Sequence, residues 1–568
     1  MNRTSRPRNI ARSRTSSAAV SHLRLGLVAS FILSIGCRAD ADATADTGTS
    51  SESGHDTAHG SEAADSGDAS EGGSEESGTG DTGGPIGGDL PDVVCDPPLG
   101  YYDTSSPTAV VGDGTPQSCT GAALTAAAQQ GGVITFDCGA EPVTITLDAQ
   151  IVLPIDRDTT IDGNGLVTLD AQGMTRHFYF DSEGWMDNDA KVVLQRLDFV
   201  GGAAPTGEYF PQDPANPNCA YGYKEGSGGV IYVRNGKLHV LGCHFEGNVA
   251  ALEGPDVGGG AIYVLGSAEV LISASVFRNN RAANGGAIGF LWANPHIYNS
   301  IFEDNVAEGR GKNYVEPGCP LFNHDEQGGA GGNSGAVIFD GMSDANVTYT
   351  ICGSVFRDNR ANELGGALFR TPNDGQLHML IDRCLFDSNS AALGGATFIK
   401  QNDLEVRAST FMHNRGAVDI DGNAVDGWFG GLWLNTGDLT VVNSTFYDNE
   451  PTGLDVEVGA GTVTNATIVA SKPTGAMSFA NSLFVDTTCD APLTGTASLQ
   501  WPETTQCISG ASVDDPGLGE IGSHGGPTPT FLPEADGPAA GMGSSCPEDD
   551  QRGEVRPTDG CAAGSVEP

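Results

Sequence analysis

Two pairs of neighbouring aspartates could supply the carboxyl groups that cleave a glycosidic bond. They are Asp514–Asp515 and Asp549–Asp550. Paired carboxylates can supply the acid and the base of glycoside hydrolysis, and His524 follows the first pair in a Ser-His-Gly-Gly segment. An Arg-x-Lys triplet, which could clamp an acidic sugar, occurs only at 310–312, far upstream of both pairs. This order does not assemble one catalytic set, so we assign no catalytic residue.

The segment 419–426 is similar to a calcium-binding loop only in part. Its acidic residues have suitable spacing, but Ala424 stands where such a loop needs glycine, and Gly430 stands where it needs a bidentate glutamate. We therefore expect a solvated acidic turn, and neither a metal site nor a cofactor. Weak calcium binding by loop carboxylates remains open, because 73 acidic residues against 28 basic ones give a formal net charge of −45.

The distribution of charge excludes nucleic acid as a partner. A phosphate backbone is held by clustered Lys and Arg, and the sequence has no such cluster beyond Arg38. The basic N-terminus and the apolar run from Leu25 to Ile35 predict an export signal over 1–36, too short for a membrane span. The end of that run resembles a bacterial lipobox, which implies a lipid anchor on Cys37; an ordinary signal peptide is the alternative.

Composition predicts a disordered tether over residues 37–93. This segment consists almost entirely of acidic residues, Ser, Thr, Gly and Ala, so it cannot bury enough apolar surface to fold. Beside a lipid-bearing cysteine, such a tether would hold the folded part away from the membrane.

The cysteine count fits an oxidising compartment. Of thirteen cysteines, setting aside Cys37 leaves an even number, as a disulfide framework requires. Sequence does not fix connectivity, and Cys243 and Cys384 can equally be buried thiols. The candidate local pairs are Cys119 with Cys138, Cys489 with Cys507, and Cys546 with Cys561.

Two short motifs alternate along the centre of the chain, and each occurs seven times. One is a Gly-Gly-Ala type of step, from Gly228 to Gly430; the other is Phe-x-x-Asn. Repeats of about 25 to 35 residues indicate a solenoid, because one unit cannot bury its own apolar face. We expect the Phe and Asn side chains to stack as structural ladders: Phe245, Asn248, Phe277, Asn280, Phe302, Asn305, Phe356, Asn359, Phe386, Asn389, Phe411, Asn414, Phe446 and Asn449.

The alternation of residues within each repeat predicts strands. Segments such as 261–265 and 270–274 have period two, and no helical period appears between the motifs. The prediction is an all-β fold, a parallel β-helix over 94–490 whose coils lie about 4.8 Å apart. Asn would occupy left-handed corners, and an Ala-rich helix within 119–130 would cap the first coil.

Two repeats carry insertions of similar length, 206–227 and 310–333, at the same point of the repeat. Long connections on a rigid scaffold often hold binding sites, and these combine aromatic with polar groups, as carbohydrate or protein partners require. The alternative is plain loops pinned by Cys219 and Cys319. The candidate binding residues are Tyr209, Phe210, Tyr221, Tyr223, Lys224, Tyr314, Phe322, His324, Asp325 and Glu326.

The alternating motifs, over roughly 110–490, resemble the repeats of chlamydial polymorphic outer membrane proteins and of the pectin-lyase-like superfamily. The resemblance implies a single-stranded right-handed coil, and many members of that superfamily cleave acidic glycans. The pectate-lyase signatures Trp-x-Asp-His and Arg-x-Pro-x-x-Arg are absent from this sequence. The region 491–568, with Asp515-Pro-Gly and Arg556-Pro, is similar to the choice-of-anchor Q domain of exported bacterial surface proteins.

Together these features predict an exported, lipid-anchored bacterial surface protein. We expect a monomer at the outer membrane or cell surface, or otherwise outside the cell, that touches membrane through its lipid alone. Adhesion or display is the leading function, with carbohydrate or protein as partner. A polysaccharide lyase or hydrolase acting on acidic glycans is one alternative, and a passive surface spacer is another.

Overall fold

The computed structural model describes residues 92–204, 223–252, 257–310, 331–341, 348–371, 377–503 and 507–568. The predicted signal, Cys37 and nearly all of the tether lie outside these residues. So do Cys219, Cys319 and most of the candidate binding residues, namely Tyr209, Phe210, Tyr221, the side chain of Tyr223, Tyr314, Phe322, His324, Asp325 and Glu326.

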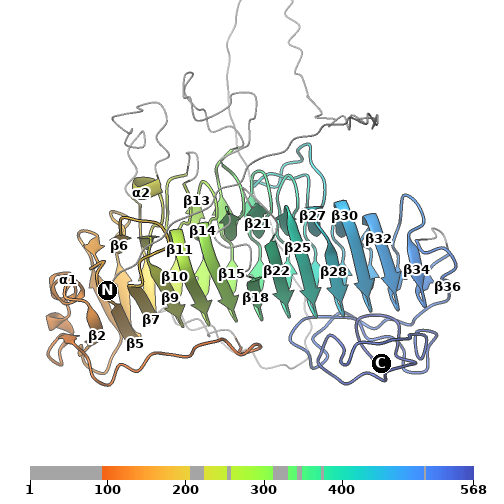
Figure 1. Ribbon diagram of the computed structural model, residues 1–568, viewed down its shortest axis with the longest axis horizontal. Coiled ribbons are helices and arrows are strands. Elements are labelled where there is room, and N and C mark those ends of the chain that lie inside the picture. Colours follow the sequence, from red (N-terminus) through yellow and green to blue (C-terminus); the bar gives the residue numbers. More distant parts are fainter. Residues whose placement is uncertain are drawn as a thin grey trace, which may run out of the picture. The chain divides into compact units, whose positions relative to one another are not determined.

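The described chain is a single-stranded right-handed parallel β-helix, as the sequence predicts (Figure 1). Each coil contributes up to three strand segments, and these pair in parallel with the equivalent segments of neighbouring coils. Crossovers between parallel strands are right-handed because twisted strands pack back on the sheet only in that sense.

We name the three faces of the helix by their strands. The front face contains β4 (Ile151–Val152), β6 (Phe178–Asp181), β8 (Ile231–Arg234), the first halves of β11 (Ile262–Ser273) and β14 (Ile288–Tyr298), β17 (Val337–Asp340), β21 (Leu368–Thr371), β24 (Thr397–Ile399), β27 (Leu432–Thr436), and the first halves of β30 (Leu454–Thr464) and β32 (Pro473–Ala480).

The strap face contains the second halves of those four long strands and the shorter strands around them. These are β1 (Ala109–Val111), β2 (Gly132–Phe136), the first halves of β5 (Thr159–Asp170) and β7 (Lys191–Val200), β9 (Lys237–Leu241), β18 (Thr348–Cys352), β22 (Leu377–Asp382), β25 (Asn402–Arg407), β28 (Leu439–Val442) and β34 (Thr494–Thr496).

The ladder face carries the Phe-x-x-Asn motifs. It contains β3 (Val143–Thr146), the ends of β5 and β7, β10 (His244–Glu246), β12 (Val276–Arg278), β15 (Ile301–Glu303), β19 (Val355–Arg357), β23 (Leu385–Asp387), β26 (Thr410–Met412), β29 (Thr445–Tyr447), β31 (Thr467–Val469), β33 (Leu483–Val485), β35 (Leu499–Trp501) and β36 (Ser512–Val513). A small turn sheet adds β13 (Arg281–Ala282), β16 (Val306–Ala307) and β20 (Arg360–Ala361).

The seven motif phenylalanines form one buried stack inside the helix. Successive ring centroids lie 4.6 to 5.2 Å apart, and the rings are nearly parallel. Phe199 extends the stack at one end, 4.9 Å from Phe245. Each ring is at most 1% exposed, so the stack supplies a large share of the apolar burial that no single coil could provide.

The motif asparagines form a hydrogen-bonded ladder beside the rings. Asn305 Nδ2 donates to Asn359 Oδ1 at 3.0 Å and to the Phe277 carbonyl at 2.9 Å. In turn, Asn305 Oδ1 accepts from the backbone N–H and the amide of Asn280. The residue before each Asn, not the Asn itself, takes the left-handed backbone, which corrects the sequence-based expectation. Each Asn amide is thus free to bond along the helix axis.

A helix and a strap close the N-terminal end. Helix α1 (Gly121–Ala128) is capped by the Thr120 hydroxyl and buries Leu124, Ala127 and Ala128 against the first coil. Residues 92–108 then form the strap, which runs past the ends of the strap-face strands (Figure 1). Its Cys95 is bonded to Cys352, 257 residues away, and its Tyr102 hydrogen-bonds Gln195 and His239.

Coil pairing continues beyond residue 490, through β36. The remaining residues, 514–568, cover the ladder face near its C-terminal end (Figure 1). There the outward position of the strands carries Thr445 and Thr467, whose hydroxyls hydrogen-bond Gln551, Thr530 and Ser565 in a buried network. Short helices η1 (Pro116–Ser118) and α2 (Tyr223–Gly226) complete the structure. Among the described residues no helix is long and apolar enough to span a bilayer.

Replacing one rung of the amide ladder should destabilise the whole helix. In an Asn305→Ala variant, buried groups of Asn280, Asn359 and Phe277 each lose a hydrogen bond from the Asn305 side chain, at a total cost of about 3 kcal/mol or more. We expect a clearly lower melting temperature by circular dichroism. Asn423→Ala is the matched control, because that amide is exposed and, within the part of the chain that the structure describes, bonds only to Asp419. Equal melting temperatures for the two variants would contradict the ladder's role.

Candidate functional site

The outward side of the front face carries one continuous column of side chains. Strand register aligns Tyr179, Tyr232, Tyr263, Gly289, Ile338, Phe369, Phe398, Trp433, Asp455 and Thr474, in that order. Ile338, Phe369, Phe398 and Trp433 pack together as an apolar cluster outside the main core. The column therefore changes from aromatic to polar between Trp433 and Asp455.

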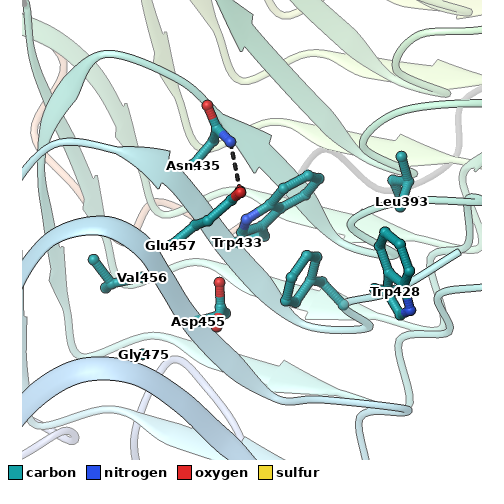
Figure 2. Close-up of a pocket in the computed structure, with 9 residues that line it drawn as sticks. Leu393, Trp428, Trp433, Asn435, Asp455, Val456, Glu457 and Gly475 are labelled. Carbon is teal, nitrogen blue, oxygen red and sulfur yellow. Dashed lines mark hydrogen bonds between the residues drawn. The ribbon is translucent and has the colours of Figure 1, made fainter. Parts of the chain in front are cut away.

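A groove of about 450 Å³ lies at that change of chemistry (Figure 2). It crosses strands β27, β30 and β32 at the front face. Its lining combines aromatic rings with carboxylates and consists of Leu393, Trp428, Phe429, Trp433, Asn435, Asp455, Val456, Glu457 and Gly475.

Two carboxylates enter the groove from β30. Asp455 and Glu457 are two residues apart on one strand, so both point outward while Leu454 and Val456 enter the core. Asp455 is 4% exposed. The Thr474 hydroxyl donates to its Oδ1, and its Oδ2 is buried without a hydrogen-bond partner. This burial raises the pKa of Asp455 to about 6.

Glu457 is held by a neighbouring side chain. Asn435 on β27 donates from Nδ2 to Glu457 Oε2 at 2.6 Å (Figure 2). Its hydrogen bond fixes that carboxylate at the rim of the groove and leaves Oε1 to face other groups. The pair of oxygens, Glu457 Oε1 and Asp455 Oδ2, gives the groove acceptor capacity that the described residues do not use.

Three aromatic residues form the other side of the groove. Trp433 is 7% exposed, and its indole Nε1 is buried without a partner. The Phe429 ring stacks on Trp433 at 4.4 Å, whereas Trp428 is 60% exposed and presents a free indole to solvent. A buried N–H donor thus lies in the same groove as a buried carboxylate acceptor.

Phe429 stands where earlier repeats have the first glycine of the Gly-Gly step. Residues at that position, such as Gly365 and Gly394, have positive φ, and Phe429 keeps this conformation at φ 64°. A bulky residue is costly in the left-handed region, and strain of that kind concentrates at binding sites. The substitution places an aromatic ring in the groove where the other coils have none.

The groove was not predicted from the sequence. Two signals could have found it: the Trp428-Phe429 pair directly before the seventh Gly-Gly step, and the Leu-Asp-Val-Glu alternation at 454–457, which puts both acids on one face of a strand. The residues that the repeats share do not reveal the groove, because it lies where one repeat differs from the others.

The residues considered for glycosidic chemistry do not come together. Asp514, Asp515 and Asp549 are exposed, whereas Asp550 is buried and accepts from Arg552. His524 shares a hydrogen bond with the Glu520 carbonyl. The segment 419–426 is an exposed turn in which Asn423 donates to Asp419.

Lys224, from the candidate binding residues, is described and has a structural role. Its ammonium pairs with Asp181 at 2.7 Å. Its carbonyl is one of several that accept from the buried guanidinium of Arg176, which fixes α2 to the front face.

The cysteine pairs expected from the sequence are present as disulfides. Cys119 bonds Cys138, Cys489 bonds Cys507, and Cys546 bonds Cys561. Cys243 and Cys384 are buried free thiols in the serine column of the ladder face. Burial raises the pKa of each to about 12, so both are unreactive near neutral pH.

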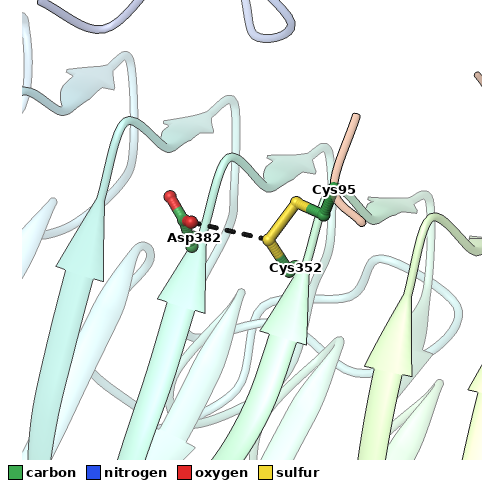
Figure 3. Close-up of side chains that lie close together, drawn as sticks. All are labelled: Cys95, Cys352 and Asp382. Carbon is green, nitrogen blue, oxygen red and sulfur yellow. Dashed lines mark hydrogen bonds between the residues drawn. A yellow bond between two sulfur atoms is a disulfide. The ribbon is translucent and has the colours of Figure 1, made fainter. Parts of the chain in front are cut away.

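The strap disulfide is a structural feature and not a metal site. Cys95, Cys352 and Asp382 lie close enough to hold an ion (Figure 3). However, bonded sulfurs offer no thiolate, and Asp382 already pairs with Arg383 at 2.7 Å. The pairing of Cys95 could not be foreseen, because its partner belongs to a distant coil.

Neither a protein-family model nor a curated protein matches this sequence. Solved structures of similar fold include PfbA, a surface adhesin of Streptococcus pneumoniae, at 12% identity and a TM-score of 0.35, covering 71% of this chain and 91% of that one. A second PfbA structure covers 69% and 96%, again at 12% identity and 0.35. Pectate lyase Pel9A matches at 12% and 0.34 over 81% and 97%. Similarities of this size carry no argument about the groove.

Because the pKa of Asp455 is raised, we expect the free energy of unfolding to depend on pH. A carboxyl with a pKa of about 6 when folded, against 3.8 when unfolded, binds its proton more tightly in the native state. Its contribution is therefore most favourable below pH 3.8 and is lost as the pH rises through 6. Relative to the wild type, Asp455→Asn should gain up to about 3 kcal/mol between pH 4 and pH 7.5, measured by urea unfolding. A pH-independent difference would contradict this assignment.

Proposed function

We propose that this protein is an exported surface protein whose front-face groove binds a hydroxyl-rich glycan. The observation that carries the proposal is the buried Trp433 N–H donor lying in one groove with the buried Asp455 acceptor, both without partners. A hydroxyl both accepts and donates, so one sugar hydroxyl, or two neighbouring ones, would satisfy both atoms. Without such a ligand each buried group costs stability.

The aromatic side of the groove supports the same class of ligand. A sugar ring has an apolar C–H face and a polar edge, and binding sites of this kind pair aromatic walls with a few placed polar groups. The exposed Trp428 indole offers a face for the ring, while Asp455 and Glu457 face its edge. Acidic glycans fit poorly, because the described lining holds two carboxylates and no Lys or Arg.

Adhesion is the activity that this arrangement supports best. A rigid stack of coils presents the groove at a fixed place on the front face, and the disulfides fit an oxidising compartment outside the cytoplasm. Attachment through a lipid on Cys37 and the predicted tether would turn glycan binding into adhesion at the surface of a bacterium. The resemblance of the repeats and of 491–568 to bacterial surface proteins points the same way.

Truncating the aromatic wall should abolish binding. We expect Trp433→Ala and Trp428→Ala each to weaken glycan binding at least tenfold on a neutral-glycan array and by calorimetry, because stacking area is lost. Trp185→Ala is the control, since Trp185 is an exposed tryptophan that packs against Trp292, away from the groove. Undiminished binding by both groove variants would refute the assignment of the site. Release of new reducing ends during the assay would instead indicate catalysis.

The anchor has a separate test. Radiolabelled palmitate should be incorporated by the wild type and not by Cys37→Ala when both are expressed in a diderm bacterial host. The label then reports the thiol as the acylation site, independently of any glycan. Equal incorporation by the two proteins would remove Cys37 as the acylation site, and no incorporation by the wild type would leave a secreted protein.

A further inference from the structure

The lining of the groove carries negative charge. Two carboxylates face it, and the lining contains no basic residue. Lys400 is exposed and follows the strand that pairs with β27, but it does not line the groove. Two other basic side chains, Arg415 and Lys472, are paired with Asp448 at 2.9 Å and with Asp490 at 2.6 Å. The acidic excess of the whole chain adds to the negative potential of the groove. A ligand with a positive charge would gain from this field.

We propose that the groove is selective for glycans that carry free amino groups, the glucosamine type, an inference that rests on the proposed glycan binding. The ammonium would donate to Asp455 Oδ2 and Glu457 Oε1, the two carboxylate oxygens without described partners. A hydroxyl of the same sugar would accept from Trp433 Nε1, and its C–H face would lie on Trp428.

An ammonium would interact more favourably with the two carboxylates of the groove than a hydroxyl would. A buried carboxylate without a partner is unfavourable, and pairing it with a hydrogen-bonded cation offsets much of its desolvation cost. Burial, together with the nearby Glu457 carboxylate, raises the pKa of Asp455, and a cation beside it would oppose that rise. Aromatic faces also attract cations, and two of the rings, Phe429 and Trp433, stack directly beside the carboxylates.

Other classes of ligand would pair with fewer of the polar groups in the groove. A uronate would place its carboxylate against Asp455 and Glu457. An N-acetylated sugar replaces the ammonium with a neutral amide, which has one N–H donor in place of three. A neutral hexose can satisfy Trp433 and Asp455 but brings no charge to Glu457. Only the free amine uses every polar group that the groove offers.

Three disaccharides with one skeleton test the inference. Chitobiose, diacetylchitobiose and cellobiose share the β-1,4-linked gluco backbone and differ at carbon 2, which carries an ammonium, an acetamide or a hydroxyl. Binding to the full mature protein is measured by calorimetry at pH 6.5, where an ordinary amine is protonated, and at about 0.3 M salt to screen unspecific attraction. We expect chitobiose to bind at least tenfold more tightly than the other two.

Matched variants separate the groove from the charge of the whole protein. Asp455→Asn and Glu457→Gln should each remove the preference for chitobiose over cellobiose, because each removes one of the two carboxylates that would hold the ammonium. A control variant, Glu141→Gln with Asp148→Asn, removes two exposed carboxylates near the first coils and should keep the preference. Circular dichroism confirms that each variant is folded.

The outcomes distinguish the two proposals. Equal affinity for all three disaccharides would overturn the amino-sugar inference and leave glycan binding intact. A preference for chitobiose that persists in both groove variants would also overturn it, because the charge would then act elsewhere. Absence of binding by all three sugars would refute the inference together with the proposed function.

Discussion

Coil-to-coil hydrogen bonding by buried asparagine side chains is the constraint on which the structure depends. Each amide accepts from the coil before it and donates to the coil after it, as for Asn280, Asn305 and Asn359. A shift of one residue would leave every rung unpaired and would turn the phenylalanines outward. Register is therefore fixed inside the helix, and it determines which outward side chains become neighbours.

The groove is a consequence of this inherited register. Along the front-face column, apolar side chains follow one another until Trp433 meets Asp455. Phe429 replaces a glycine that the turn would otherwise use, and the change adds an aromatic wall at the same coil. A few substitutions on an unchanged frame thus suffice to build a binding site, because the frame already determines which residues become neighbours.

The internal parts of the fold were predictable from the sequence, and the external parts were not. The Phe and Asn positions predicted the parallel β-helix, because each motif recurs with one structural task in every coil. The sequence-based prediction put the left-handed backbone at the Asn, one residue too late. The ladder needs Asn for the hydrogen bonds of its side-chain amide and not for its backbone conformation. The strap could not be predicted, because Cys95 pairs with a coil far along the chain. Groove residues such as Asp455 were not predicted, because they differ from the residues that the other repeats share.

The ladder fixes the coil register, and that register brings Trp433 and Asp455 together in the groove that would hold an amino sugar. A crystal structure of the protein grown with chitobiose tests it most directly. We expect the sugar ring to lie on Trp428, with its ammonium between Asp455 and Glu457 and a hydroxyl at Trp433 Nε1. Sugar density at another face, or a register in which Trp433 and Asp455 are not neighbours, would contradict it.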